Sequence, residues 1–125
     1  MTSEIDNLTI SQIKTLLKSK KISSLELTKH YLDNSRVAKQ LNAYSFISEE
    51  FAINQAIEAD KKISTNGFED LSGIPFGIKD IFCTKGFPTQ AASKILDGFI
   101  PEYESTITEK LFKAGAVMLG KTNMD

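Results

Sequence analysis

The chain has 125 residues, 41% of them hydrophobic and 25% charged, a composition typical of a globular domain with its own core. Fifteen basic and 16 acidic residues give a formal net charge of −1, so no overall positive field indicates a nucleic-acid-binding protein. No apolar run approaches the ~20 residues that span a bilayer, and one histidine and one cysteine are too few ligands for a zinc site made by this chain.

The N-terminal half is predicted to form a helical arm with one short strand. Residues 9–12 (TISQ) have the spacing of a capping box, and the apolar stripe that follows them predicts a helix. Residues 23–26 (SSLE) repeat this spacing and open a second predicted helix over about 24–39. The aromatic, β-prone segment 42–48 predicts a strand, and helical periodicity returns over 49–63.

The C-terminal half predicts a strand, a helix and a second strand. The first strand is expected over 74–81, interrupted by Pro75 and Gly77, and the Gly- and Pro-containing segment 84–101 is expected to be a loop. Residues 106–109 (TITE) form a third capping box, Gly115 suits the left-handed position after that helix, and 116–119 is the next predicted strand. This order is typical of a βαβ crossover and predicts an α/β fold with a largely parallel sheet.

These elements predict two parts of the chain. Residues 1–64 form the helical arm with its one strand, and residues 65–125 form the start of the α/β core.

Residues 115–122 (GAVMLGKT) match the spacing of a phosphate-binding loop. That loop needs a strand before its first glycine and a helix after its Lys-Thr pair. Here a predicted helix precedes Gly115, and the four residues between the two glycines are apolar and strand-like. We therefore interpret the segment as a helix cap followed by a strand.

Cys83 and the N-terminus predict the compartment. The first residues lack the basic start and apolar centre of a signal peptide, and a single cysteine cannot form an internal disulfide, so we expect a cytoplasmic protein. A nucleophilic Cys83 would need a nearby base, and the only histidine, His30, is far away in a predicted helix. We interpret Cys83 as a half-buried packing residue.

Lys79 stands inside the otherwise strand-like run GIPFGIKDIF, residues 73–82. In a strand it shares a face with Pro75 and Gly77, which leave room for a backbone, a side chain or a ligand. One interpretation is a lysine that reaches water or pairs with Asp80. The other is a general base, because a lysine removed from water has a lowered pKa and can accept a proton from a serine.

The sequence resembles the amidase-signature enzymes. The resemblance is carried by LSGIPFGIKDIFCTKG, TQAASKILDGF and YESTITEKLFKAGAVMLGKTNMD, and it extends to the opening helical pair LTISQIKTLLKSKKISSLELTKHYLD. Within that family it is most similar to the A subunits of the glutamyl-tRNA(Gln)/aspartyl-tRNA(Asn) amidotransferases. It implies an α/β/α sandwich with a mixed, largely parallel sheet, of which this chain would be an incomplete N-terminal part with a helical arm.

The resemblance also implies a chemistry. Family enzymes use a Ser–cis-Ser–Lys triad, in which the lysine of G-I-K-D, here Lys79, accepts a proton through a bridging serine while a second serine attacks the amide. In the amidotransferases, which are ligase complexes, this step releases ammonia from glutamine for transamidation of a misacylated tRNA. The implied partners are the B and C subunits, with tRNA bound through the complex. ATP and magnesium are expected on a companion subunit, and no cofactor or metal on this chain.

The sequence departs from the family pattern in one respect. Both family serines lie in a Gly/Ser-rich segment after G-K-T-N-M-D, and no such segment occurs in these 125 residues. Ser72 and Ser93 match neither serine, so we assign them no catalytic role and expect the chain alone to be inactive. Two alternatives remain open: another amidase-signature hydrolase of small amides, and a non-catalytic α/β assembly module. Nucleotide binding at residues 115–122 is a third, more distant alternative.

Overall fold

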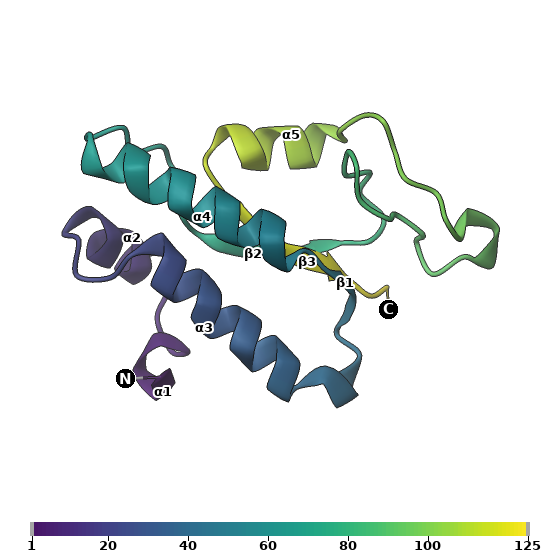
Figure 1. Ribbon diagram of the computed structural model, residues 1–125, viewed down its shortest axis with the longest axis horizontal. Helices are drawn as coiled ribbons and strands as arrows, with labels where there is room; N and C mark the ends of the chain where they lie inside the picture. The colour runs from purple at the N-terminus through teal and green to yellow at the C-terminus, as the bar shows by residue number, and fades with distance from the viewer. Residues whose placement is uncertain (1, 125) are drawn as a thin grey trace.

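The computed structural model describes residues 2–124, and its elements follow the predicted order (Figure 1). The helices are α1 (Thr2–Ile5), α2 (Ile10–Lys18), α3 (Ser24–Val37), α4 (Glu49–Ser64) and α5 (Thr106–Lys113), with 3-10 turns at Lys39–Leu41 and Lys94–Leu96. The strands are β1 (Tyr44–Ile47), β2 (Pro75–Lys79) and β3 (Val117–Thr122).

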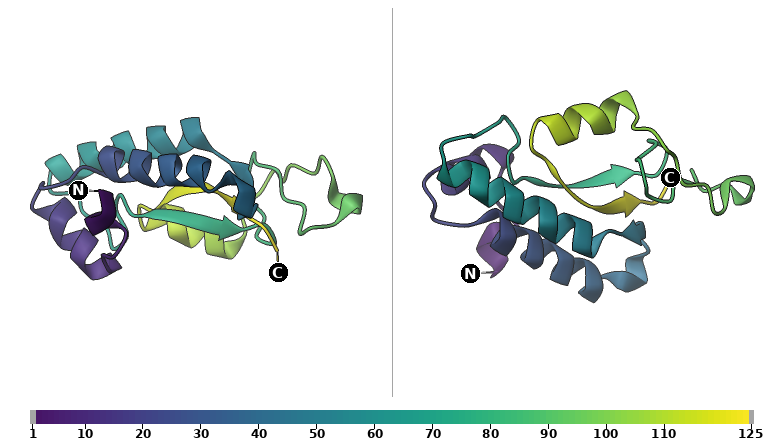
Figure 2. Two further views of the ribbon diagram at one scale, coloured as in Figure 1. Left: turned by 90° about the horizontal axis from the view of Figure 1, so that it is seen from below. Right: turned by 45° about the horizontal axis from the view of Figure 1, so that its top comes forward.

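The three strands form one mixed sheet in the order β1-β3-β2. β2 and β3 are parallel and are joined through α5, so the predicted crossover is confirmed. β1 pairs with β3 in the antiparallel sense, so the described sheet is less parallel than predicted. Helices α3 and α4 lie on one face and α5 on the other (Figure 2), which agrees with an α/β fold of three layers.

The helices begin where side chains satisfy their first free N–H groups. Thr9 and Ser23 each accept from the backbone three residues on, and both predicted capping boxes are confirmed. The predicted start of α5 is wrong by one residue, because Ser105 has the extended backbone of an N-cap and accepts from the Thr108 N–H. The short helix α1 was not predicted.

The sheet and the helices α2 to α4 enclose two apolar clusters. The first contains Ile13, Leu17, Leu27, Ile63 and Ile74. The second contains Leu32, Ala52, Ala56, Val117 and Leu119. The small alanines allow α4 to lie close to β3, and the first cluster ties α2 and α3 to the start of β2. β1 and α4 belong to the predicted N-terminal arm, yet both contact β3 of the predicted α/β core. The division of the chain into two parts at residue 64 stays a prediction.

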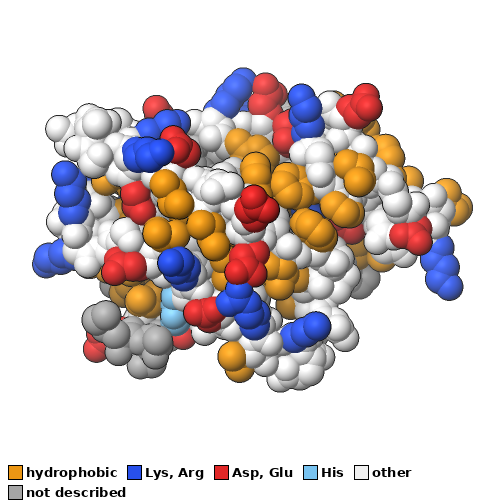
Figure 3. All heavy atoms as spheres, viewed as in Figure 1, with side chains coloured by type: hydrophobic (Ala, Val, Ile, Leu, Met, Phe, Trp, Pro, Cys, Tyr) orange, Lys and Arg blue, Asp and Glu red, His pale blue; other side chains and the backbone are white. Residues whose placement is uncertain are grey.

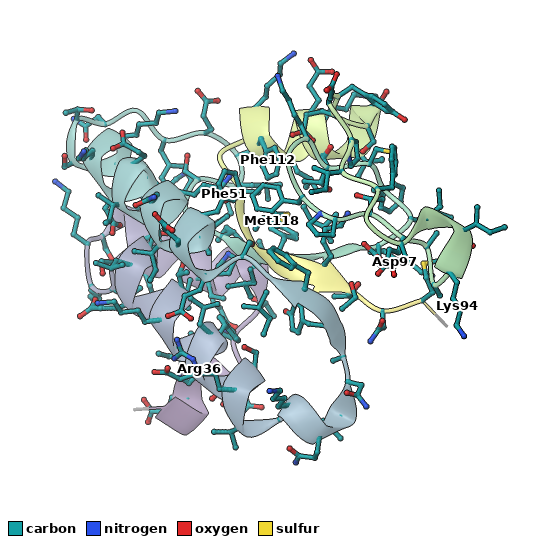
Figure 4. The ribbon with its side chains drawn as sticks, turned by 45° about the vertical axis from the view of Figure 1, so that its right-hand side comes forward. Arg36, Phe51, Lys94, Asp97, Phe112 and Met118 are labelled. Carbon is teal, nitrogen blue, oxygen red and sulfur yellow. The ribbon has the colours of Figure 1, made fainter. Side chains whose placement is uncertain are left out.

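A group of aromatic side chains lies between α4 and α5. Phe51 of α4, Phe112 of α5 and Met118 of β3 lie close together (Figure 4). The Phe51 ring centroid is 6.0 Å from that of Phe112 and 4.7 Å from that of Phe87. Hydrophobic side chains gather along the line between α4 and α5 (Figure 3), where a groove of about 310 Å³ is lined by Phe51 and Phe112.

The segment that matched a phosphate-binding loop is a strand. Gly115 follows α5 with φ +90°, as predicted, and the chain is extended from Val117 to Thr122, three residues beyond the predicted end. Gly120 allows this extension, because a side chain there would place its Cβ 2.2 Å from the Phe46 carbonyl oxygen of β1. The backbone of this segment therefore serves the sheet, and its interpretation as a helix cap followed by a strand is confirmed.

Candidate active site

The carboxyl ends of β2 and β3 lie side by side. Lys79 is the last residue of β2, and its partner in register is Thr122, the last residue of β3. In open α/β sheets, ligands bind outside the carboxyl ends of parallel strands. By this general rule Lys79, the only residue predicted to be catalytic, lies at the carboxyl-terminal end of the sheet, where a site is expected. The final residue of the G-K-T-N-M-D motif, Asp125, is outside the described residues.

Lys79 is half-buried and shares a face of the sheet with Gly77 and Thr122. Two side chains of the domain lie close to Gly77, which is itself exposed. A Cβ on Gly77 would lie 2.8 Å from Thr122 Cγ2 and 3.2 Å from the Tyr44 hydroxyl oxygen. Burial raises the pKa of Tyr44, so this hydroxyl stays protonated at neutral pH.

A tight turn follows Lys79. The Lys79 carbonyl oxygen accepts from the Phe82 N–H at 3.0 Å, which closes the turn. The Asp80 N–H donates to the Thr122 carbonyl oxygen at 2.9 Å, and the Asp80 carbonyl oxygen accepts from the Ala91 N–H at 3.1 Å. The Asp80 carboxylate also accepts from the Gln90 N–H at 3.1 Å. The backbone that carries Lys79 is therefore tied both to β3 and to the loop at residues 90–91.

Lys121 is a residue that the sequence reasoning missed. Its side chain is 0% exposed, and its ammonium donates to the Phe82 carbonyl oxygen at 2.8 Å and to Thr89 Oγ1 at 3.1 Å. Asp80 Oδ1 is 3.6 Å from Lys121 Nζ. Burial lowers the pKa of Lys121, while the Asp80 carboxylate acts in the opposite direction. The sequence did contain a signal for Lys121: in MLGKT a lysine lies near the end of an apolar strand, just as one does in FGIKD.

The other residues considered from the sequence do not join this site. Ser72 is buried, and its hydroxyl accepts from the Glu69 N–H at 2.7 Å in the turn before β2. Ser93 lies in the long loop before α5. Cys83 is half-buried, as predicted, with its sulfur 3.5 Å from the Tyr103 hydroxyl oxygen.

The described part of the chain offers neither a metal cluster nor a membrane span. Residues 2–124 contain no group of three or more His, Cys, Asp or Glu side chains placed to hold a metal ion. Within the same residues, no helix has both the length and the apolar character required to cross a membrane.

Comparisons with known proteins agree on one family. The sequence model of the family described as Amidase matches residues 26–125. A curated relative from Coxiella burnetii, named as the A subunit of glutamyl-tRNA(Gln) amidotransferase, is 48% identical over 94% of this chain and 24% of its own length. A relative of the same name from Dinoroseobacter shibae is 49% identical over 98% of this chain and 25% of its own.

Solved structures give the same result. An amidase family protein from Bacillus anthracis superposes with a TM-score of 0.89 at 32% identity, over 98% of this chain and 25% of its own. The native peptide amidase from Stenotrophomonas maltophilia superposes with a TM-score of 0.86 at 27% identity, over 94% of this chain and 25% of its own. The chain spans about a quarter of the length of the curated relatives it matches.

Proposed function

Because this chain belongs to the amidase family, we propose that it supplies the N-terminal part of a glutamine-hydrolysing subunit of a tRNA-dependent amidotransferase. The observation that carries the proposal is the 48–49% identity, over 94% and 98% of the chain, to relatives named as the A subunit of glutamyl-tRNA(Gln) amidotransferase. The position of Lys79 at the carboxyl end of β2 supports it.

In this proposal Lys79 is the proton acceptor. Its amine takes a proton through a bridging serine, a second serine attacks the amide carbon of glutamine, and ammonia leaves. Both serines belong to the Gly/Ser-rich segment that family members carry after G-K-T-N-M-D. The chain of residues 1–125 therefore contributes one member of the triad and is inactive alone.

The proposal extends to the complex. The B and C subunits are the expected partners, and the ammonia would be used by a companion subunit that holds ATP, magnesium and the misacylated tRNA. The chain itself would bind no cofactor, and the reaction would take place in the cytoplasm.

The test is a chimera in which residues 1–125 replace the matching N-terminal portion of the Coxiella burnetii relative. Co-expressed with that organism's companion subunits, the chimera is expected to release ammonia from glutamine. Lys79→Ala should lower kcat by at least about 100-fold, the usual contribution of a positioned acid or base, without changing the melting temperature. Near-parental turnover in Lys79→Ala would remove Lys79 from the mechanism, and ammonia release by residues 1–125 alone would contradict the predicted inactivity.

A second candidate is an amidase-signature hydrolase that acts on a small amide without partner subunits. The observation that favours it is the TM-score of 0.86 with a peptide amidase. Binding distinguishes the two: a tagged chain of residues 1–125 should retain the purified B and C subunits if the first proposal is right, and should not retain them if the protein acts without partner subunits. A chain that binds these subunits but gives a chimera without hydrolysis would instead support the assembly module.

A further inference from the structure

Two lysines lie at the carboxyl ends of neighbouring strands and point to opposite faces of the sheet. Lys79 is paired in register with Thr122, and Lys121 is paired with Ile78. Side chains alternate along a strand, and residues paired across two strands share a face, so Lys121 lies on the face opposite to Lys79. Any effect of Lys121 on Lys79 must therefore pass through the backbone that joins the two faces.

The contacts of Lys121 provide that connection. Its ammonium donates to the carbonyl oxygen of Phe82, and the N–H of Phe82 donates to the carbonyl oxygen of Lys79. The Lys121–Phe82 bond is 2.8 Å long and the Phe82–Lys79 bond is 3.0 Å long, so the backbone of Phe82 takes part in both. Lys121 thus holds the last residue of the turn whose first residue is Lys79.

Asp80 adds a second connection within the same turn. Its side chain is 4% exposed, and its Oδ1 atom is buried with no hydrogen-bond partner among the described residues, 3.6 Å from Lys121 Nζ. The other carboxylate oxygen accepts from the Gln90 N–H. The Lys121 ammonium is therefore the positive charge that compensates the buried Asp80 carboxylate, directly after Lys79 in the chain.

A buried ion pair of this kind is a poor source of stability. Removing two charges from water costs several kcal/mol per ion, and well-packed apolar residues of the same volume often give equal or greater stability. A buried pair does fix geometry, because each charge tolerates few positions of the other. The three groups that the Lys121 ammonium contacts belong to the segment after β2: Phe82, Asp80 and Thr89.

We propose that Lys121, together with Asp80, is a positioning residue for Lys79: it fixes the turn that sets the direction of the proton acceptor. This inference rests on the proposed function of Lys79. Lys121 is not itself a catalytic residue, because its side chain is completely buried on the other face of the sheet. A misplacement of about 1 Å at a reacting group can reduce turnover about 100-fold.

The kinetic test uses the chimera with its companion subunits. Lys121→Met, which keeps an unbranched side chain one atom shorter and removes the charge, should lower kcat for glutamine hydrolysis about 10- to 100-fold and change KM less than about threefold. The matched control is Lys113→Met, since Lys113 is an exposed lysine on α5 whose ammonium pairs with Glu109 of the same helix; it should keep parental kcat.

The double variant Asp80→Asn with Lys121→Met separates positioning from stability. It removes both charges, so a purely structural pair predicts recovery of both melting temperature and kcat. A positioning pair predicts that the melting temperature recovers while kcat stays about tenfold or more below the parent. The double variant also decides the question if Lys121→Met alone fails to fold.

Hydrogen exchange of the chain of residues 1–125 gives an independent readout. In Lys121→Met the Phe82 and Ala91 amides, which close the turn and tie it to the loop, should exchange at least about tenfold faster, while the Leu27 amide in α3 is unchanged. Unchanged protection at Phe82 and Ala91 would overturn the inference, as would Lys121→Met with kcat within about twofold of the parent. If Lys79→Ala keeps full activity, the proposed function itself fails, whatever Lys121→Met does.

Discussion

The helical layer and the carboxyl end of the β2–β3 pair are built in different ways. In the helical layer, α2 and α3 begin at side chains only three residues from the N–H groups they satisfy, and their inner faces are apolar. At the strand ends, Lys121 contacts residues 32 and 39 positions away along the chain, and the contacts are polar and buried. Local sequence therefore marks where these helices begin, although Asp60 of α4 also accepts from the Ser24 and Leu25 N–H groups at the start of α3. The second region exists only after the sheet has formed. We therefore expect substitutions in the two regions to differ in their effect on the free energy of unfolding.

The largest effect is expected in the sheet, at Gly120. A Cβ there would lie 2.2 Å from the Phe46 carbonyl oxygen and 3.0 Å from Ile47 Cα, both backbone atoms of β1. Gly120→Ala should therefore separate β1 from β3 and lower the free energy of unfolding by about 4 kcal/mol or more, measured by denaturant unfolding. The control is Gly98→Ala, at φ +81° with no described atom within 4 Å of the new Cβ, which should cost only about 1–2 kcal/mol. Equal costs at the two glycines would refute the close approach.

The next effect is expected in the apolar core of the helical layer. Leu27 of α3 is 0% exposed and belongs to the cluster that ties α2 and α3 to β2. Leu27→Ala removes buried methyl groups and leaves a cavity, so unfolding should become easier by about 2–5 kcal/mol in the same denaturant measurement. Leu41→Ala is the control, because Leu41 is 71% exposed and should change stability by less than about 0.5 kcal/mol.

The contrast between local contacts in the helical layer and long-range contacts at the strand ends explains which features could be predicted from the sequence. The starts of α2 and α3 were predicted because each capping box lies within four residues, and Gly115 because the left-handed conformation after a helix favours glycine. The Asp60 carboxylate, which accepts from the Ser24 and Leu25 N–H groups of α3, had no such local signal. The one-residue error at the start of α5 arose because Ser105 and Thr106 are both acceptable N-caps. The structure ties Ser105 to a distant segment, because its N–H donates to the Cys83 carbonyl oxygen at 2.8 Å.

The candidate site was predicted only in part. Lys79 lies near the end of a strand, as predicted, although β2 ends at Lys79 itself, two residues before the predicted end at Ile81. Its catalytic role stays a prediction. Lys121 was not recognised as a buried residue, because its burial depends on the register that pairs it with Ile78 and on the return of the loop at Thr89. Register follows from strand pairing and from an irregularity that leaves Leu119 of β3 without a partner between the pairs Phe76–Met118 and Gly77–Gly120. Neither has a signal within one segment.

A smaller effect is expected at the cap of α3. The Ser23 hydroxyl accepts from the Glu26 N–H at 3.0 Å and so satisfies one of the free N–H groups of the first turn. Ser23→Ala should lower stability by about 1 kcal/mol, the usual cost of a lost N-cap. Ser11→Ala, an exposed serine inside α2, is the matched control and should change stability by less than about 0.5 kcal/mol, because alanine favours the helix. A larger loss at Ser11 than at Ser23 would contradict the local origin of the helix start.

The smallest effect is the pH dependence of the same cap. Hydrogen bonds from the Ser23 backbone and hydroxyl hold the pKa of Glu26 below its ordinary value of 4.5. Since the folded pKa is lower than the unfolded one, the contribution is fully present above pH 4.5 and is lost as the pH falls through the folded pKa. Glu26 is exposed to solvent, so the contribution should be only a few tenths of a kcal/mol.

The measurement compares the unfolding free energy of the parent with that of Glu26→Gln between pH 7 and pH 3. Lys113 lowers the pKa of Glu109 as well, so Glu109 also contributes to the pH dependence of stability. Because both proteins contain Glu109, its contribution cancels in the difference between them. The difference should be fully present at pH 7 and should decrease as the pH falls toward pH 3. A difference that grows as the pH falls would reverse the sign and show that the carboxylate form of Glu26 does not stabilise the start of α3. A loss at pH 7 above about 1 kcal/mol would mean that this cap, like the Lys121 pair, depends on contacts beyond its own turn.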